Sequence, residues 1–330
     1  MSEGSKALRV AIVGAAHWHV PMYLPGIAEA GGRITAVWDD DPQRAATFAN
    51  RHGAAALNTA AQIANPDLID LAFVFGRPAA MPILARPFIE AAIPISMEKP
   101  CGLTPGDVAA LDALARARGA HVSVALVQRH DGPARHLLEV LEPGSVSAIT
   151  ARFIAGPPQR YHDAGCGWLL DPRQSGGGAL MNLGVHFVDL ALALTGARCE
   201  RVHCEISNRL HGALVEDYAS LMMRLDNGAL ATIETGYAFP AAAGKRDFRL
   251  TIAHAGGYAD FDGKRLQLVS NSGDVQSLAV AIDTDDYYRT YARDVITAVA
   301  TGAPPRAGLA QMQAAFGVLK KAYDAARPLL

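Results

Sequence analysis

The first 127 residues alternate short apolar runs with stretches of helical pattern, and this alternation constrains the fold more than any other feature. The clearest runs are Leu8–Val13, Arg33–Trp38, Leu68–Phe75, Ile93–Met97 and His121–Val127. Strands that alternate with helices form a parallel sheet covered on both faces, which explains why Leu68–Phe75 is almost continuously apolar. We count six strands in about 120 residues, which predicts a doubly wound α/β (Rossmann) sheet whose ligand lies at the carboxyl ends of the strands.

The chain changes character after Val127, so we divide it into a first domain of residues 1–127 and a second domain of residues 128–330. Alternating apolar and polar runs dominate the second part. They predict strands near Ser147–Ile154, Arg201–Ser207, Tyr218–Leu225, Leu230–Tyr237, Phe248–Ala253, Tyr258–Phe261 and Arg265–Val269. Turns at Asp226-Asn227-Gly228 and Asp262-Gly263 favour hairpins. We therefore expect a C-terminal α+β domain with an open, mainly antiparallel sheet.

Two helices near Asp285–Thr301 and Leu309–Ala326 close the chain, and the last helix is a candidate to pack back on the first domain. Helices on one face of an open sheet leave its other face without cover. A second copy of the chain is the expected cover. The sequence therefore predicts a homodimer or homotetramer.

The composition narrows the classes of partner. Half of the 330 residues are hydrophobic and 19% are charged, which is ordinary for a globular protein of two domains. A net charge of −2 is not the positive charge expected of a protein that binds nucleic acid or an acidic membrane. The apolar run Leu8–Val13 is too short to span a bilayer. The four cysteines form no C-x-x-C pair. We expect free thiols, no metal site, a cytoplasmic location and a small-molecule partner.

The turn after the first strand partly matches a dinucleotide-binding loop. Such a loop carries glycines for the turn, for the approach of the pyrophosphate and for close packing of the next helix. Gly14 holds the first position, whereas Ala16 and His19 hold the second and third, with His17 and Trp18 between them. The N-terminus of the following helix would offer N–H groups and a positive dipole end to the pyrophosphate. A strand-turn-helix without a nucleotide is the alternative for this segment taken alone.

Asp39 ends the second expected strand, where an acidic residue meets the adenosine ribose. A carboxylate there accepts hydrogen bonds from both ribose hydroxyls and repels a 2′-phosphate, so NAD is favoured over NADP. Arg44 nearby would weaken this preference. The alternative is a solvated turn, because three aspartates follow one another from Asp39 to Asp41.

Glu98-Lys99-Pro100 follows the apolar strand Ile93–Met97 and therefore lies at the edge of the sheet where ligands bind. Burial weakens the preference of a lysine for its charged form. Lys99 beside a hydroxyl or carbonyl can thus hydrogen-bond the reacting oxygen and exchange a proton with it. Glu98 would orient that lysine or contact the cofactor, and Pro100 turns the chain out of the sheet. A plain ion pair at a strand end is the alternative.

A second motif carries Asn182 and His186 on an expected helix after Gly176-Gly177-Gly178. The two residues are four positions apart and share one helix face. A neutral imidazole accepts a hydroxyl proton as hydride leaves the same carbon, and an asparagine amide can position a substrate or fix the histidine tautomer. The glycines would let the backbone approach a ligand. A structural histidine is the alternative for His186 taken alone, and Asp189 reads as structural.

With these motifs the chain resembles the glucose-fructose oxidoreductase/inositol dehydrogenase/MocA-like (Gfo/Idh/MocA) family over essentially its whole length. The resemblance rests on the N-terminal loop, on Glu98-Lys99-Pro100 and on the block from Trp168 through the glycines to His186 and Asp189. It implies a Rossmann domain joined to an open antiparallel α/β domain, oligomers built through that sheet, and reversible oxidation of a sugar, polyol or related secondary alcohol. It also implies that Lys99 is the active-site lysine and His186 the catalytic histidine.

The chain departs from the family pattern at two further places. Asn182 stands where many members carry aspartate, and a neutral amide does not stabilise an imidazolium as a carboxylate does. The segment Phe75-Gly76-Arg77-Pro78 lacks the threonine-proline-asparagine of the family. Contacts of Gly76 and Arg77 on the nicotinamide side are therefore expected to differ.

The sequence thus predicts an NAD-dependent dehydrogenase or reductase of a sugar-like secondary alcohol, with Lys99, His186 and Asn182 as catalytic residues. Cofactor contacts are expected from Gly14, Ala16, His17, Trp18, His19, Asp39, Gly76, Arg77, Glu98 and Lys99. Substrate contacts are expected from Asn182, Arg129, His130, Tyr161, His162 and Trp168. Arg129 would meet a substrate carboxylate or form a surface ion pair. Two alternatives stay open: a glycosidase or lyase that oxidises C3 transiently and returns the hydride, and a non-catalytic sensor of a dinucleotide or sugar.

Overall fold

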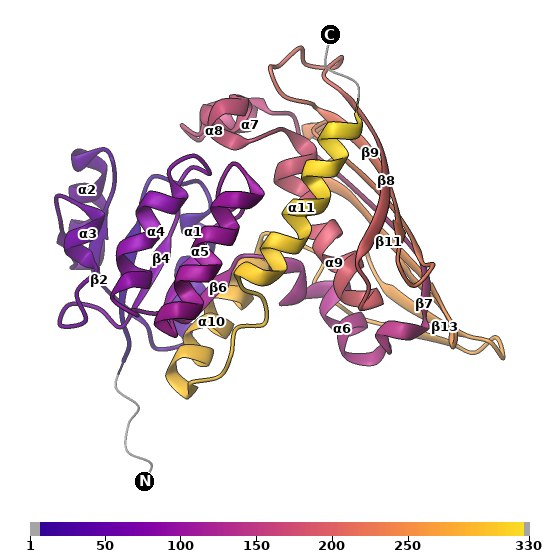
Figure 1. Cartoon of the computed structure of the whole chain (residues 1–330), viewed down its shortest axis with the longest axis horizontal. Coiled ribbons are helices and arrows are strands. Elements are labelled where there is room, and N and C mark those ends of the chain that lie inside the picture. The colour runs from indigo at the N-terminus through magenta and orange to yellow at the C-terminus, as the bar shows by residue number, and fades with distance from the viewer. Residues whose placement is uncertain (1–6, 327–330) are drawn as a thin grey trace. The chain divides into compact units, whose positions relative to one another are not determined.

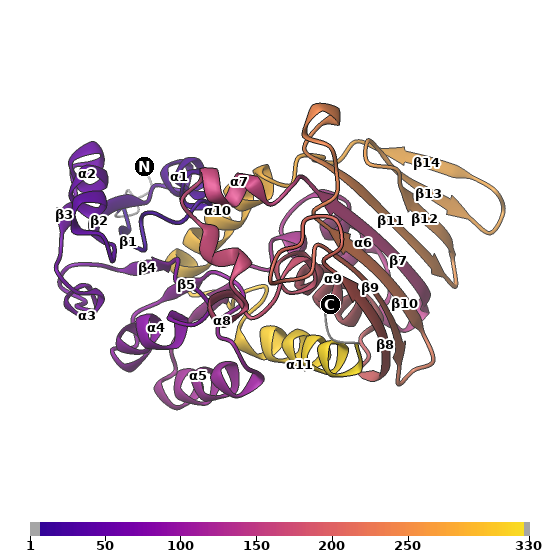
Figure 2. The same ribbon diagram turned by 90° about the horizontal axis from the view of Figure 1, so that it is seen from above.

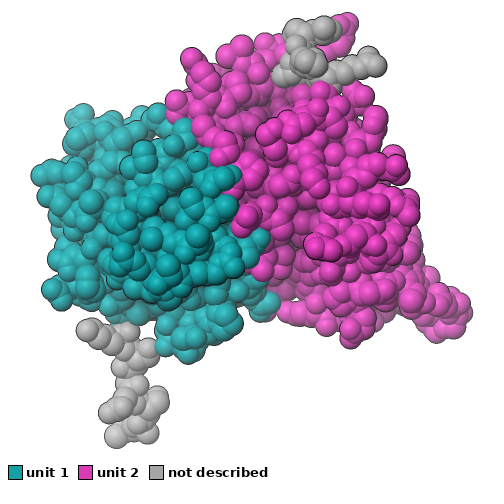
Figure 3. Space-filling model, in the orientation of Figure 1, with its two compact units in different colours: residues 1–102, 106–125, 288–310 teal, residues 103–105, 126–287, 311–330 magenta. Residues whose placement is uncertain are grey.

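The computed structural model describes residues 7–326, which form two compact units (Figure 3). Unit 1 holds the described residues up to 102, together with 106–125 and 288–310. Unit 2 holds 103–105, 126–287 and the described residues from 311 onward. Apart from the short stretch 103–105, the chain passes from unit 1 to unit 2 after residue 125, close to the predicted boundary at 127/128. It also returns to unit 1 for 288–310, which the sequence analysis had placed in the second domain.

The return of 288–310 is explained by aromatic packing within unit 1. Helix α10 (Asp286–Thr301) presents Tyr291, whose hydroxyl lies 2.8 Å from Ser96 Oγ, and the Tyr23 and Tyr291 ring centroids are 5.7 Å apart. A Cβ built on Gly26 would lie 2.0 Å from the carbonyl oxygen of Arg289, so α10 approaches the backbone at that glycine. The penultimate helix, not the last one, therefore joins the first unit.

Unit 1 is built on a six-stranded parallel sheet in the order β3-β2-β1-β4-β5-β6. Its strands are β1 (Arg9–Val13), β2 (Arg33–Trp38), β3 (Ala55–Ala56), β4 (Leu71–Val74), β5 (Ile95–Met97) and β6 (Val122–Val124). The helices are α1 (Val20–Glu29), α2 (Pro42–His52), α3 (Ala60–Ile63), α4 (Met81–Glu90), α5 (Pro105–Arg118) and most of α10 (Figure 1). The order reverses between β1 and β4, which marks the ligand-binding edge of a doubly wound sheet. The predicted Rossmann fold is confirmed.

Some strands of this sheet are shorter than the apolar runs that predicted them. The run Leu68–Phe75 starts with a turn, because the N–H groups of Leu68 and Ile69 both donate to the carbonyl oxygen of Asn65. The run His121–Val127 pairs only over β6 and then enters a 3-10 helix at Val127–Arg129. Hydrophobicity marks burial on both sides of such turns, so it overstates the length of the strand.

Unit 2 is built on an eight-stranded sheet in the order β14-β13-β12-β11-β7-β10-β9-β8. Its strands are β7 (Val146–Ala155), β8 (Cys199–Ser207), β9 (Tyr218–Leu225), β10 (Leu230–Gly236), β11 (Arg246–His254), β12 (Gly257–Phe261), β13 (Leu266–Ser270) and β14 (Val275–Leu278). Every pair is antiparallel except β7 with β10. The predicted open, mainly antiparallel sheet is confirmed. The sequence analysis missed β14, because this short edge strand buries almost nothing and so shows no alternation.

Helices cover one face of this sheet (Figures 1 and 2). These helices are α6 (Gly132–Val140), α9 (Val185–Thr195) and α11 (Leu309–Ala325). Unit 2 also holds two short helices, α7 (Gln159–Asp163) and α8 (Pro172–Ser175). Along β9, Leu221 and Met223 are fully buried, whereas Met222 is 51% exposed. The opposite face carries a cross-strand row in which Met222, Thr232, Thr150 and Thr251 are register partners. This outer face has no cover among the described residues.

One helical stretch of the described chain, Pro172–Thr195, is long and apolar enough to cross a membrane by length and composition alone. Its most apolar window is 83% buried inside the protein. A helix that is apolar all round is also what a protein core requires. The stretch is therefore weak evidence for a membrane span.

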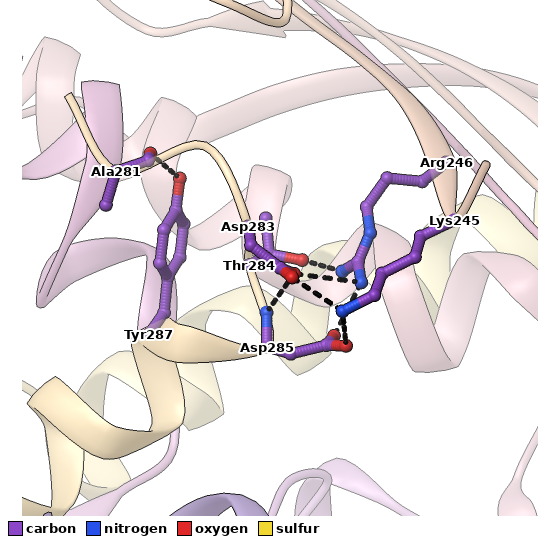
Figure 4. A network of polar contacts seen from close by, with 7 residues as sticks. All are labelled: Lys245, Arg246, Ala281, Asp283, Thr284, Asp285 and Tyr287. Carbon is purple, nitrogen blue, oxygen red and sulfur yellow. Dashed lines mark hydrogen bonds and ion pairs between the residues drawn. The ribbon is translucent and has the colours of Figure 1, made fainter. Parts of the chain in front are cut away.

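A network of charged side chains fixes the segment before α10 (Figure 4). Lys245 Nζ donates to Asp283 at 2.5 Å and to Asp285 at 2.9 Å. Arg246, the first residue of β11, pairs with the same two carboxylates, at 2.5 Å from Asp285. Two cations against two carboxylates thus anchor this segment to the sheet where the chain leaves unit 2.

Candidate active site

The turn after β1 closes tightly on the end of β4. Gly14 has a φ of 90°, and a Cβ built there would lie 2.3 Å from the carbonyl oxygen of Phe75. Only glycine suits both the left-handed backbone and the lack of space. Gly14 N also donates to the carbonyl oxygen of Trp38 at 2.7 Å, which joins the turn to β2. The first position of the nucleotide-loop pattern therefore has a clear physical reason.

Helix α1 begins at Val20, after the loop that carries His17, Trp18 and His19. The Val20 N–H donates to the carbonyl oxygen of His17 at 3.0 Å, and the Met22 N–H donates to that of His19 at 2.8 Å. Pro21 between them has no N–H. The free N–H groups predicted at this helix end are thus engaged or missing. A pyrophosphate would rely on the loop backbone before α1 and on the positive end of the helix dipole, whose first turn holds no acidic side chain.

The carboxylate of Asp39 is buried and accepts two backbone hydrogen bonds. Oδ2 accepts from Ala16 N at 2.7 Å, and Oδ1 accepts from Asp41 N at 3.0 Å. Burial raises the pKa of Asp39, and the two backbone donors oppose that rise. The sequence analysis expected only a ribose acceptor, whereas the structure shows that Asp39 also holds the glycine loop. Each carboxylate oxygen can accept two bonds, so the ribose role still fits.

The histidines of the loop differ in their surroundings. His19 N donates to His17 Nδ1 at 3.2 Å, which leaves the ring proton of a neutral His17 on Nε2. Burial, together with a smaller effect of His19, lowers the pKa of His17 to about 3. The His19 ring packs against Trp18 and Tyr288, with centroids 4.1 and 4.3 Å away. The place that the fingerprint gives to a small residue is therefore filled by aromatic rings.

Glu98 collects three donors at the end of β5. Its Oε1 lies 2.9 Å from His19 Nδ1 and accepts from the Tyr23 hydroxyl at 2.6 Å. Its Oε2 accepts from Lys99 N at 3.1 Å. Burial by itself raises the pKa of Glu98, but His19, His17 and Lys99 outweigh burial and hold it below its usual value. An ionised carboxylate thus ties the loop before α1 to the backbone of Lys99.

Lys99 is only 8% exposed and lies at the carboxyl edge of the parallel sheet. Burial lowers the pKa of Lys99 to about 8, and Glu98 opposes the shift. A lysine that titrates near neutrality can both accept and donate a proton in a catalytic cycle. The geometry therefore fits an acid/base group better than a plain surface ion pair.

Gly76 and Arg77 follow β4 and reach the loop after β2. A Cβ on Gly76 would lie 2.8 Å from Leu84 Cδ1, so this glycine allows α4 to pack closely. An Arg77 guanidinium nitrogen donates to Asp40 Oδ2 at 2.9 Å. The end of β2 is where the adenosine ribose lies in this fold. The Arg77 side chain thus contacts the loop that follows β2.

In unit 2, Asn182 lies on a π-turn, Leu180–Gly184, and not on the regular α-helix that was predicted. A π-turn is wider than an α-helical turn, so Asn182 and His186 do not keep the relative rotation of an ordinary i, i+4 pair. Asn182 Nδ2 donates to the Tyr161 hydroxyl at 2.9 Å and to the Tyr237 hydroxyl at 3.1 Å. Both amide hydrogens are used, so toward any other group Asn182 can only accept, through Oδ1.

A cation supports the two tyrosines beside Asn182. Arg160 donates to the Tyr161 hydroxyl at 2.7 Å, and its guanidinium carbon lies 4.8 Å from the Tyr161 ring centroid and 5.8 Å from that of Tyr237. Because the Tyr161 oxygen accepts from both Arg160 and Asn182, its own proton must point in a third direction. A side-chain hydrogen bond with Tyr237 also involves this hydroxyl, so the fully buried Tyr161 is held within unit 2 itself.

His186 is buried in the first turn of α9, and two contacts fix that helix. Phe187 packs against Phe153 and Phe248 on the sheet, with centroids 5.4 and 5.5 Å away. Asp189 accepts from Arg129 through both oxygens, at 2.7 and 2.8 Å. Burial raises the pKa of Asp189, and Arg129 counteracts the rise. These contacts set the position of the imidazole-bearing turn.

The other predicted substrate residues are spread over unit 2. Arg129 forms a partly buried ion pair with Asp189, so the ion pair considered from the sequence is present but does not lie on the surface. His130 is buried beside it. His162 is exposed on α7, and Trp168 is partly exposed in the 3-10 helix Gly167–Leu170.

The glycines before the π-turn are also explained by the protein itself. A Cβ on Gly177 would lie 2.2 Å from the Tyr323 hydroxyl, and one on Gly178 would lie 2.1 Å from the carbonyl oxygen of Glu216. Side chain and backbone of unit 2 therefore occupy the space that the sequence analysis had reserved for a ligand.

Two family models match the chain. One, described as the oxidoreductase family with an NAD-binding Rossmann fold, matches residues 8–126, and the GFO/IDH/MocA C-terminal domain matches residues 133–259. The chain belongs to the Gfo/Idh/MocA family. The resemblance deduced from Glu98-Lys99-Pro100 and the glycine-histidine block is thereby confirmed, and with it an oxidoreductase family that binds NAD.

Solved structures show the same fold as this Gfo/Idh/MocA protein. A UDP-N-acetylglucosamine 3-dehydrogenase from Acidithiobacillus ferrooxidans is 19% identical over 97% of each chain, with a TM-score of 0.80. An aldose-aldose oxidoreductase from Caulobacter crescentus, complexed with glycerol, is 19% identical over 97% of each chain, with a TM-score of 0.81. A levoglucosan dehydrogenase, complexed with NADH and levoglucosan, is 16% identical over 96% of each chain, with a TM-score of 0.84. A search of curated protein sequences gave no significant match.

Two residues of the candidate site escaped the sequence analysis. Tyr23 and Tyr237 are fully buried and bond to Glu98 and Asn182 through their hydroxyls. Tyrosines in an apolar helix or strand look like ordinary core residues. Their only sequence signal is a polar atom at a position that the pattern buries, which requires a partner.

Proposed function

We propose that this protein is an NAD(P)-dependent dehydrogenase or reductase of a sugar, polyol or sugar acid, with NAD preferred. The reaction would exchange a hydride between the nicotinamide and a secondary alcohol or its ketone. The observation that carries the proposal is the buried Lys99 at the carboxyl edge of the parallel sheet, whose pKa is lowered to about 8 by burial. A sensor that only binds a dinucleotide has no need of such a group.

The residues present fit a dinucleotide. Gly14 provides the tight turn, and Asp39 stands at the end of β2. The start of α1 carries the positive end of the helix dipole and no acidic side chain, which favours a bound anion. When bound, the nicotinamide would accept or supply the hydride. The carboxylate of Asp39 supports a preference for NAD, because a 2′-phosphate next to a buried negative charge is repelled.

The protein side chains would accept or donate the hydroxyl proton when the hydride is transferred. In alcohol oxidation, Lys99 or His186 would accept the hydroxyl proton as the carbinol hydride leaves, so that the products are a ketone, the reduced nicotinamide and a protonated side chain. We assign His186 as the base and Lys99 as its acid/base partner, which hydrogen-bonds the reacting oxygen and exchanges a proton with it. Asn182, held by Tyr161 and Tyr237, would orient a substrate hydroxyl through Oδ1.

The substrate class rests on the similar structures, whose printed names concern sugar derivatives such as UDP-N-acetylglucosamine, an aldose and levoglucosan. The polar groups around Asn182 agree with a polyhydroxylated ligand, because two phenols and a guanidinium offer several donors. We also infer that a second copy of the chain covers the outer face of the eight-stranded sheet, where Met222 and Leu230 are 51% and 44% exposed.

The proposal is tested by a screen of sugars, inositols and sugar acids with NAD and NADP, followed as absorbance at 340 nm. Denatured protein is assayed for released nucleotide in parallel. Net NADH with at least one substrate supports a dehydrogenase. Bound nucleotide with substrate conversion but no net NADH would instead indicate the glycosidase or lyase that returns its hydride.

The catalytic assignment is tested with His186→Ala. We expect turnover to fall by at least about a hundredfold, the low end for a lost acid or base, while the affinity for NADH stays unchanged in a fluorescence titration. His254→Ala, at the far end of β11, is the matched control and should retain full turnover. Near-wild-type turnover of His186→Ala would contradict the assigned role.

A further inference from the structure

The backbone of the turn that carries Asn182 is held by a residue far away in the sequence. Glu216 Oε1 and Oε2 both lie 2.9 Å from Gly178 N, and Oε1 also accepts from Leu180 N at 2.9 Å. The carbonyl oxygen of Glu216 accepts from Ala179 N at 3.0 Å. Three successive N–H groups at the start of this helix thus bond to one residue outside it. An α-helix normally leaves such groups to water or to a local cap.

A second residue, on the C-terminal helix, holds the same turn; we call Glu216 and Tyr323 together the clamp. Tyr323, on α11, accepts from Met181 N at 3.1 Å and donates its hydroxyl proton to Glu216 Oε1 at 2.7 Å. Glu216 is 2% exposed. The partners of four consecutive N–H groups, 178–181, therefore lie entirely on Glu216 and Tyr323.

The fit between clamp and backbone leaves no room for side chains at the glycines. A Cβ on Gly177 would lie 2.2 Å from the Tyr323 hydroxyl, and a Cβ on Gly178 would lie 2.1 Å from the carbonyl oxygen of Glu216. Gly177 and Gly178 are thus the two positions at which the clamp excludes a side chain. A side chain at Gly177 or Gly178 would displace Tyr323 or Glu216.

The clamp acts on the geometry of Asn182 because the turn it holds is a π-turn. In a π-turn the N–H groups bond to carbonyls one residue further away than in an α-helix, and such turns are rare and occur mostly as single turns inside α-helices. Asn182 N donates to the carbonyl oxygen of Gly178 at 2.9 Å, directly after the clamped residues. If the clamp were lost, the turn could relax toward a regular α-helix and rotate Asn182 away from Tyr161 and Tyr237.

We propose that Glu216 and Tyr323 are positioning residues for the hydride-transfer reaction, which act through the π-turn by fixing the rotation of Asn182. This inference rests on the proposed function. It gives the C-terminal helix α11 a part in the reaction, although that helix carries none of the residues assigned to the chemistry.

The test compares Tyr323→Phe and Glu216→Gln with Asp324→Asn, a change of an exposed carboxylate on the same helix. In Tyr323→Phe we expect turnover to fall between about tenfold and about a hundredfold, the range for a small misplacement of a reacting group. The NADH dissociation constant should stay within about twofold, because the dinucleotide loop lies in the other unit. Amide hydrogen exchange of a peptide covering 178–184 should accelerate, while peptides of β9 and β10 keep their protection. Asp324→Asn should match wild type in all three measurements.

Each outcome decides between the proposals. Faster exchange at 178–184 with unchanged turnover would overturn the positioning role, and so would unchanged exchange and unchanged turnover. If the wild-type protein neither binds NADH nor converts any sugar, the proposed function fails and the positioning role fails with it. If Glu216→Gln does not fold, Tyr323→Phe alone decides, since it removes one oxygen atom and keeps the ring.

Discussion

Lys99 should titrate far below an ordinary lysine, and this can be measured without knowing the substrate. Burial lowers its pKa from 10.5 to about 8, a shift that corresponds to about 3 kcal/mol against the charged form. At pH 7 a lysine with a pKa of about 8 is neutral in about one molecule in ten, whereas a pKa of 10.5 leaves about three in ten thousand neutral. Burial thus raises the amount of free amine about three-hundredfold.

The chain has six lysines, so their side-chain signals can be followed one by one in an NMR titration of protein labelled with carbon-13 lysine. Comparison with Lys99→Arg identifies the Lys99 signal. It should move with an apparent pKa near 8, and Glu98→Gln should lower that value further, because Glu98 is the group that opposes the shift. Lys245 is an internal control, since hydrogen bonds to Asp283 and Asp285 raise its pKa above 10.5.

The same pKa should govern catalysis with a definite sign. In alcohol oxidation kcat/KM should rise with pH and level off above about 8, because the neutral amine is the form that accepts a proton. In the reverse direction the rate should fall over the same range. A Lys99 signal that titrates near 10.5 would refute the burial argument, and so would a Glu98→Gln variant with a raised value.

Three further predictions concern the fold and the cofactor loop. Gly14→Ala should lower the free energy of unfolding by about 2 kcal/mol or more in urea titrations and weaken NADH binding, because the added Cβ collides with the carbonyl oxygen of Phe75; an unchanged NADH affinity would contradict the role of this turn. Asp39→Asn should reduce the preference for NAD over NADP by at least about tenfold in kcat/KM, since it removes the charge that repels a 2′-phosphate; a preference equal to wild type would assign discrimination to another residue. Thr150→Arg, on the central strand of the outer sheet face, should convert the expected oligomer to monomers in light scattering, whereas a threonine-to-arginine change on α10 should not; a monomeric wild type would refute the inferred interface.

Local patterns in the sequence determined the regular parts of both units. The strand β2 coincides with the predicted run Arg33–Trp38, and β9 coincides with Tyr218–Leu225. In both cases a run of apolar or alternating residues ends at a turn signal, so the information lies within one short segment. Glu98 and Lys99 could be placed at the ligand edge for the same reason, because they follow such a run directly.

Some functional assignments needed the partners of a side chain, which no local pattern reveals. Arg129 had two possible uses from its position after a strand, and only the structure shows that Asp189 takes its guanidinium, 60 residues away. Asp39 reads as a ribose acceptor, yet its oxygens also hold the backbone of Ala16. Charged groups near a predicted site have many possible partners, and burial selects among them.

The sequence by itself determined the two sheets, the family and the identity of the lysine, histidine and asparagine expected to do the chemistry, because each of these is encoded by spacing within a few tens of residues. Tertiary structure alone decided the π-turn under Asn182, the return of 288–310 to unit 1 and the clamp of Glu216 with Tyr323. The clamp joins residues 107 positions apart. Contacts of this kind form only when distant elements pack together, so the secondary-structure preferences of neighbouring residues do not predict them.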